Sequence, residues 1–356
     1  TCALPIYDPI TAGYFKNIIY NEDRMMQVEK DLYSLDLYLR SSQQGQLIII
    51  FDELDNIVKP HKWSERISPL INLCKKMSYN TIFPKLFLRS DLFEKISNIN
   101  NKKELNNRAI TIEWNREELF SYFFKLILSH SKDEFFKLMK LYEYPSHYTN
   151  RIKNNITEAG NQPPLDEYTL RHMCYVFFGK YADASNSEKY GESYDWFFRN
   201  LKNANDTISL RPFIDLLSIA VNRAIVEDKS DRPILPPTYY TSGPTRSAAV
   251  ENHYRDLASE EGNKDLIPIF DYIRKKAAPK YKKEELGEVE FYELLDKIIE
   301  NCELEDNKDK DEIIQFLEIN GIIRLRFLKR GFSAYRSYQF ALLYKYYLGL
   351  KSKGNK

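Results

Sequence analysis

The chain has 356 residues, more than one domain usually holds, and 43% of them are hydrophobic while 29% are charged. This balance is typical of a folded protein with a sizeable core, and it excludes a disordered tail or a small disulfide scaffold. Lysine and arginine number 52 against 51 acidic residues, so the net charge is only +1. Such a balance gives no overall field that attracts nucleic acid or an anionic membrane, and any such contact needs a local patch.

The cysteines are scattered without zinc-site spacing, and they lack the density of a secreted disulfide framework. They are Cys2, Cys74, Cys174 and Cys302. We therefore expect a reducing, cytoplasmic environment. The longest apolar runs, such as residues 47–51, are far shorter than the ~20 residues that a membrane span needs, so we expect no membrane contact.

The chain begins TCALPI, without an initiator methionine. These six residues match the conceptual translation of a common sequencing adaptor, and we interpret residues 1–6 as an artefact of that kind. On this interpretation the natural sequence begins near Tyr7.

Periodicity predicts a helix over residues 22–39, followed by a strand over 47–51 (LIIIF) of the continuous apolar type that parallel sheets bury on both faces. A helix over 63–77 and a strand over 85–88 complete a predicted βαβ unit. Residues 109–114 are a third candidate strand, and Asn115 is well placed to cap the helix that follows over 117–129.

Helices are then predicted over residues 133–142, 165–178, 194–203 and 210–226. Their many aromatic side chains favour a helical core, with a base-stacking platform for single strands as the alternative. Residues 231–245 carry four prolines and predict an extended connector.

The last third of the chain predicts helices over residues 246–260, 266–276, 289–302 and 308–319. Two strand-like runs follow over residues 322–328 and 337–344. Two helices followed by a hairpin are typical of a winged helix.

The strand over 47–51 ends abruptly in Asp52 and Glu53, which matches the Walker B pattern of an apolar strand ending in paired acids. In a P-loop ATPase the first acid holds Mg²⁺ beside the nucleotide phosphates, and the second orients the attacking water. The alternative is a buried strand that ends in a solvated acidic turn.

The strand over 85–88 ends in Arg89. A guanidinium at that place can act as a sensor 1 residue, because it can hydrogen-bond the γ-phosphate and stabilise developing charge. The alternative is a structural ion pair with Asp91 or Asp52, and the two interpretations are compatible.

The segments LIIIFDELDNI, KLFLRSDLFE, AITIEWNREELF and QFALLYKYYLGLKSKG together resemble bacterial P-loop ATPases of the AAA/STAND type, within them a poorly characterised prokaryotic family with a C-terminal winged helix. The resemblance covers residues 22–353. It implies ATP and Mg²⁺ as cofactors, with Asp52 as the Mg²⁺ ligand, Glu53 as the catalytic acid and Arg89 as sensor 1. Arg211, at the start of a lid helix, becomes a candidate sensor 2 arginine that binds nucleotide.

The implied fold is an α/β P-loop ATPase core with a partial parallel sheet, then an α-helical lid and a winged-helix domain. The corresponding ranges are 7–115 for the partial core, 116–228 for the lid, 229–262 for a linker and helix, and 263–356 for the winged helix. A phosphate-binding loop, GxxxxGK[ST], is absent from the 356 residues. We expect that the loop and its strand lie upstream of a truncated N-terminus.

Basic residues gather on the predicted hairpin and its turn: Arg324, Arg326, Lys329, Arg330 and Arg336. They are candidates for contact with DNA phosphates, and the alternative is a solvated hairpin edge. The helix over 308–319 is acidic and therefore a poor reader of the major groove.

Two hypotheses follow. The first is an ATP-hydrolysing switch whose nucleotide state is coupled to assembly or to nucleic-acid contact, with a homo-oligomer completing the site. The second is a non-catalytic DNA-binding or scaffolding protein in which the ATPase fold is vestigial. A phosphate loop in the whole gene would discriminate between them, and so would the charge of the helix over 308–319.

Overall fold

The computed structural model describes residues 22–42, 45–54, 58, 63–89, 93, 96, 99, 101–141, 145–159, 163, 166–183, 185, 187–227, 234–260, 262–305, 308–330 and 333–352. The interpretation of residues 1–6 falls outside this part. The chain divides into two compact units, residues 1–109 and 110–356, and each is described by itself. The described part is mostly helical, with a small parallel sheet in the first unit and a small antiparallel sheet in the second.

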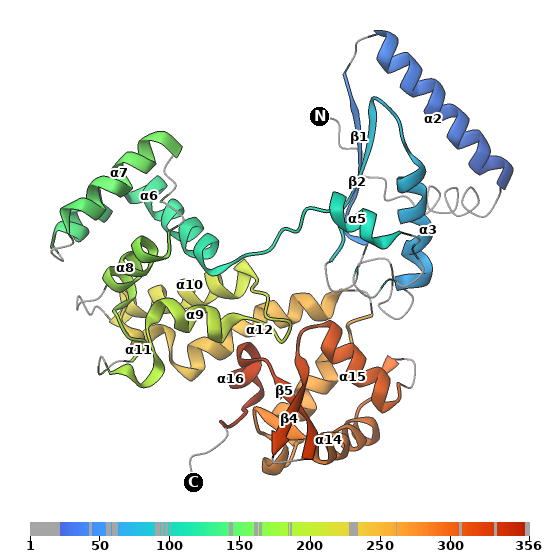
Figure 1. Cartoon of the computed structure of the whole chain (residues 1–356). Helices are drawn as coiled ribbons and strands as arrows, with labels where there is room; N and C mark the ends of the chain where they lie inside the picture. Colours follow the sequence, from blue (N-terminus) through green and yellow to red (C-terminus); the bar gives the residue numbers. More distant parts are fainter. Residues whose placement is uncertain are drawn as a thin grey trace. The chain divides into compact units, whose positions relative to one another are not determined.

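The first unit contains a parallel pair of strands linked by a helix (Figure 1). Its elements are α2 (Glu22–Ser42), β1 (Leu47–Phe51), α3 (Trp63–Lys76), β2 (Ile82–Leu86) and α5 (Lys102–Arg108). Leu47 pairs with Ile82, and the register runs on to Phe51 beside Leu86. The predicted βαβ unit is therefore confirmed.

Strand β2 begins three residues before the predicted strand over 85–88 and includes Pro84. Proline is tolerated there because β2 is an edge strand in the described sheet. The start of β2 is fixed by buried Asp36 of α2, whose carboxylate accepts hydrogen bonds from the Thr81 amide at 2.7 Å and the Thr81 hydroxyl at 2.6 Å. These bonds lower the pKa of Asp36, the hydroxyl contributing most.

The prediction that β1 is buried on both faces is wrong. Ile48 is 54% exposed and Ile50 is 62% exposed. Successive side chains of a strand point to opposite faces, so these two lie on one face of the sheet. Within the described residues that face is left open to solvent.

The prediction of a third strand over residues 109–114 is also wrong. The segment is extended, but in the described structure only Trp114 pairs, through an isolated antiparallel bridge to Ile208. Ile110 is 89% exposed and Ile112 is 79% exposed. Consecutive β-branched residues, here 110–112, favour extended backbone. A strand also needs a partner edge, and the described part supplies none here.

The helical part of the second unit begins with α6 (Arg116–Leu141), which Asn115 caps as predicted. The Asn115 side chain accepts a hydrogen bond from the Glu118 amide at 2.8 Å, and the Glu118 carboxylate accepts one from the Asn115 amide at 3.1 Å. This is a capping box. Ser131 is non-helical and divides α6 where the sequence predicts a break between two helices.

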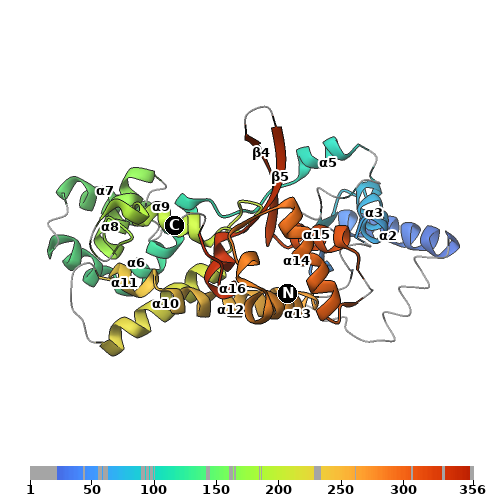
Figure 2. The ribbon, with the colours of Figure 1, turned by 90° about the horizontal axis from the view of Figure 1, so that it is seen from below.

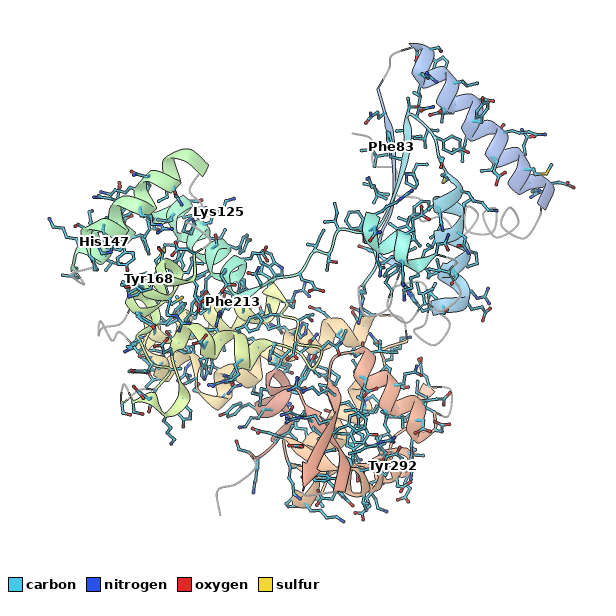
Figure 3. The ribbon with its side chains drawn as sticks, viewed as in Figure 1. Phe83, Lys125, His147, Tyr168, Phe213 and Tyr292 are labelled. Carbon is cyan, nitrogen blue, oxygen red and sulfur yellow. The ribbon has the colours of Figure 1, made fainter. Side chains whose placement is uncertain are left out.

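Four further elements build a core from aromatic side chains: α7 (Ser146–Ala159), α8 (Glu167–Phe178), α9 (Ser193–Leu201) and α10 (Leu210–Glu227). Phe120 is fully buried at its centre, with ring centroids 4.9 Å from Tyr194, 6.0 Å from Phe197 and 5.8 Å from Phe213. Figure 3 labels Phe213 among these helices. The predicted helical core is confirmed, and the stacking platform is not supported, because these rings are buried.

The prediction of an extended connector over residues 231–245 is wrong. The short helix α11 (Pro237–Tyr240) and the start of α12 (Gly243–Ser259) lie within this range. Pro237 and Pro244 occupy first turns, where the missing N–H of proline costs nothing. The Ser242 side chain accepts a hydrogen bond from the Thr245 amide and caps α12.

The C-terminal elements form a three-stranded antiparallel sheet flanked by helices, with strand order β3-β5-β4. They are α13 (Leu266–Asp271), the π-helical turn η4 (Tyr272–Lys276), the 3-10 turn η5 (Pro279–Tyr281), β3 (Glu285–Gly287), α14 (Glu288–Asn301), α15 (Lys310–Ile319), β4 (Ile323–Arg330), β5 (Ser333–Phe340), the 3-10 turn η7 (Leu342–Tyr344) and α16 (Lys345–Leu348). Figure 2 shows β4 and β5 side by side as a hairpin. Strand β5 lies earlier than the predicted run over 337–344, whose last residues form η7.

A glycine joins the helical part to this sheet. Gly321 has φ +63°, its carbonyl accepts a hydrogen bond from the Ala204 amide at 2.7 Å, and a Cβ there would lie 2.8 Å from the Asn203 side-chain nitrogen. We expect Gly321→Ala to lower the free energy of unfolding by about 2 kcal/mol, because both the positive φ and the close contact penalise a side chain. Urea denaturation measures this, with Gly287→Ala, where a Cβ meets nothing, as the control. Equal stability of the two variants would contradict the expectation.

Candidate functional site at the carboxyl edge of β1 and β2

The parallel pairing brings the carboxyl ends of β1 and β2 to one edge of the sheet. The Phe87 amide donates a hydrogen bond to the Phe51 carbonyl at 2.9 Å, so the pairing continues past the assigned strands. Asp52 directly follows β1, and Arg89 lies three residues after β2. The two predicted groups of opposite charge therefore leave the sheet at the same edge.

The backbone at Glu53 is left-handed, with φ 55°. For a residue other than glycine this conformation costs roughly 1–2 kcal/mol. The Glu53 amide donates a hydrogen bond to the Asp52 carboxylate at 2.8 Å, which holds the sharp turn at the strand end. Both side chains are exposed and therefore accessible to a ligand. Strained backbone of this kind gathers at ligand-binding sites.

Arg89 is half-buried, and its carbonyl accepts a hydrogen bond from the Phe93 amide at 2.9 Å. Asp91, one of the two acids that could pair with it, lies outside the described residues. The two sequence interpretations of Arg89 therefore both stay open.

Mg²⁺ is usually bound by one or two carboxylates together with substrate phosphates and water. Asp52 supplies one exposed carboxylate at the sheet edge, which fits this mode of binding. Within the described ranges no group of three or more histidine, cysteine, aspartate or glutamate side chains is arranged to hold a metal ion without a substrate. The one carboxylate of Asp52 fits a Mg²⁺ ion that also has water and substrate oxygens as ligands.

Arg211, the candidate sensor 2 residue, lies in the first turn of α10 and pairs with Asp256 of α12. Both side chains are 57% exposed, so the pair contributes little to stability. Arg211 belongs to the second unit and Asp52 to the first, so neither unit by itself brings the two together.

A half-buried histidine, His253, lies on α12, the helix that also carries Asp256 of this pair. Burial, and to a lesser degree the charge of Arg211, lowers the pKa of His253 to about 4. The unfolded chain therefore binds more protons than the folded one between pH 4 and 6.5, and stability is lost as pH falls through that range. We expect the free energy of unfolding to decrease by roughly 2 kcal/mol from pH 6.5 to 4. We expect His253→Gln to remove most of this slope of the free energy of unfolding against pH. Urea denaturation at several pH values checks this, and an unchanged slope in the variant would contradict it.

Three of the hairpin arginines have carboxylate partners. Arg324 bonds both carboxylate oxygens of Asp206, at 3.0 and 3.2 Å. Arg326 lies 3.9 Å from Glu285, and Arg336 lies 3.5 Å from Glu288. Lys329 and Arg330 are the last two residues of β4, and their side chains lie outside the described part. Much of the positive charge predicted for the hairpin is therefore compensated within the protein.

One residue that sequence reasoning missed is Arg246 of α12, which is 6% exposed. Its guanidinium donates to the Asn200 side-chain oxygen at 2.9 Å and lies 4.2 Å from the Tyr346 ring centroid and 5.2 Å from that of Trp196. Burial lowers its pKa to about 10. No local pattern marks it, because arginine is usually a surface residue.

Comparisons with protein-family models, with curated proteins and with solved structures find no match to this chain. In the part of the chain that the structure describes, no helix is both long and apolar enough to cross a membrane.

Proposed function

We propose that the chain is part of an ATP-binding and hydrolysing P-loop switch, in which the first unit contributes the carboxyl edge of β1 and β2 to the nucleotide site. One observation carries the proposal: the parallel pairing places Asp52, Glu53 and Arg89 at the same edge, where α/β sheets bind ligands. The left-handed backbone at Glu53 supports it, since the strain lies at the residue with the proposed chemical role.

In this proposal Asp52 holds Mg²⁺, which would neutralise charge on the nucleotide phosphates. Glu53 orients the attacking water, and Arg89 hydrogen-bonds the γ-phosphate. The exposure of both carboxylates is consistent with these roles. The proposal requires a phosphate-binding loop from outside these 356 residues, because none of them forms GxxxxGK[ST].

We assign the C-terminal elements from α13 to β5 to a winged helix. The support is the order of helix, strand, two helices and hairpin, with β5 between β3 and β4. This module would couple the nucleotide state to assembly of a homo-oligomer or to nucleic acid. A cytoplasmic location belongs to the same proposal, supported by free cysteines at positions 74, 174 and 302.

A scaffolding protein without catalysis is the second candidate. The observation that favours it is the absence of the phosphate-binding loop from the 356 residues. In that case Asp52 and Glu53 would end β1 as a solvated acidic turn.

Mg²⁺-dependent ATP binding by the product of the complete open reading frame tests the nucleotide site. We expect Asp52→Asn to raise the Mg²⁺ concentration needed for half-maximal ATP binding at least tenfold, because it removes the metal ligand. Glu113→Asn, at an exposed acid of the extended segment, is the control and is expected to bind as the wild type does. Absence of ATP binding by the wild-type product would favour the scaffold.

A further inference from the structure

Positive charge is concentrated in a stretch that the sequence analysis did not single out. Residues 272–283 contain six lysines and arginines and no acid. The stretch covers the π-helical turn η4, the 3-10 turn η5 and the residues that lead to β3. Arg274, Lys275, Lys276 and Lys280 are all exposed.

One side-chain contact and one backbone contact link the segments that carry these charges. The Lys282 ammonium donates a hydrogen bond to the Arg274 carbonyl at 2.7 Å. The Lys351 amide, near the end of the chain, donates one to the Lys282 carbonyl at 2.9 Å. We call Arg274, Lys276, Lys282 and Lys351 the basic patch. Its members come from η4, from the segment before β3 and from the C-terminal segment.

The basic patch differs from its neighbours in how its charge is compensated. Three flanking lysines each pair with a carboxylate: Lys275 with Asp271 at 2.9 Å, Lys280 with Glu293 at 2.7 Å and Lys283 with Glu290 at 2.8 Å. The nearby acid Glu284 pairs with Lys345.

By contrast, none of the four patch residues forms an ion pair with a carboxylate in the described ranges. The hairpin arginines Arg324, Arg326 and Arg336 do have such partners. Among the side chains that the structure describes in this part of the protein, the basic patch therefore carries positive charge that no carboxylate compensates.

We propose that the basic patch binds the phosphate backbone of duplex DNA without reading its sequence. Four exposed or half-buried cations match a polyanion, and each phosphate contact adds salt-dependent affinity. Single strands are held mainly by stacking on exposed aromatic rings, whereas Tyr272, Tyr281 and Tyr347 are buried here. Residues 272–283 also expose no large hydrophobic side chain that would enter a membrane interface.

This inference goes beyond the proposed ATPase, because the basic patch needs no nucleotide. It also assigns DNA contact to residues other than the hairpin arginines and the acidic helix α15. Its failure and the failure of the ATPase proposal are therefore separate results.

Fluorescence anisotropy with a labelled 20-base-pair duplex of arbitrary sequence, without nucleotide, tests the proposal on the 356-residue chain. We expect micromolar binding at about 50 mM salt, and a slope of log K against log salt of about −3.6 for four phosphate contacts. The variant Arg274→Gln/Lys276→Gln/Lys282→Gln/Lys351→Gln is expected to bind at least 30-fold more weakly and to lose most of this slope.

A matched control makes the same change of charge at four cations that already have carboxylate partners: Arg255→Gln/Lys264→Gln/Lys297→Gln/Lys310→Gln. We expect it to retain duplex affinity within about threefold. Equal loss in both variants, or no binding by the wild type at low salt, would overturn the proposal. Binding to phosphatidylserine vesicles or to polyglutamate that depends on the basic patch, without binding to the duplex, would also overturn the proposal. It would indicate an anionic membrane or an acidic protein as the ligand instead of DNA. Circular dichroism confirms that each variant is folded.

Discussion

Replacing Phe120 by alanine is expected to lower the free energy of unfolding of the second unit by about 4 kcal/mol. Phe120 is fully buried and its ring packs against Phe178, Tyr194, Phe197 and Phe213. The variant loses the burial of a large apolar side chain and leaves a cavity that rigid aromatic neighbours fill poorly. Urea denaturation followed by tryptophan fluorescence measures the change, because Trp196 packs against Phe197 in the same core.

The matched control is Phe327→Ala on β4, where the side chain is 67% exposed. We expect a change within about 1 kcal/mol, because little apolar surface is returned to water. A loss below 1 kcal/mol for Phe120→Ala would show that the aromatic residues do not form one close-packed core.

Arg246→Ala is expected to lower the same free energy by about 3 kcal/mol. Arg246 is a buried cation whose guanidinium bonds the Asn200 side chain, so its removal leaves that oxygen without this donor. The arginine also fills the space between the rings of Trp196 and Tyr346, which lose their packing partner. It thereby joins α9, α12 and α16. Thermal denaturation of the variant is expected to show a lower Tm than that of the wild type.

Two comparisons separate packing from charge at this position. Arg255→Ala removes an exposed arginine of the same helix and is expected to change stability by less than about 0.5 kcal/mol. Arg246→Met keeps most of the volume without the cost of burying a charge, so we expect a smaller loss than with alanine. A stability of Arg246→Ala equal to that of the wild type would contradict the structural role.

Local signals in the sequence predicted local structure well. The Walker B-like strand coincides with β1, and the capping box at Asn115 depends on Glu118 only three residues away. The break at Ser131 lies between the helices predicted over residues 117–129 and 133–142. Each of these features is determined by residues close together in the chain.

Features that depend on distant partners were not predicted. Burial of Ile48 and Ile50 was inferred from their apolar character, but burial depends on what covers the sheet. Residues 109–114 have strand-like composition and no partner edge among the described residues. Arg324 meets Asp206, which is 118 residues away, so no sequence pattern indicates that the charge is compensated.

The candidate site shows the same division. The predicted βαβ unit implies parallel pairing, and the register of β1 and β2 confirms that pairing, so Asp52 and Arg89 leave the same edge of the sheet. The left-handed turn at Glu53 was not predicted, because glutamate rarely adopts that conformation. The four cations of the basic patch come from three segments of the chain, and only the fold shows that they have no carboxylate partner among the described residues.

The most direct test of the central claim is the rate of ATP hydrolysis by the product of the complete open reading frame, compared with its Glu53→Gln variant. The proposal predicts ATP hydrolysis by the wild type and a decrease in kcat of at least about 100-fold in the variant, with ATP affinity retained. The reason is that the glutamine amide cannot polarise the attacking water as the Glu53 carboxylate does. Equal kcat in the two proteins, or no hydrolysis by the wild type, would contradict the assignment of Asp52 and Glu53 to an ATPase site.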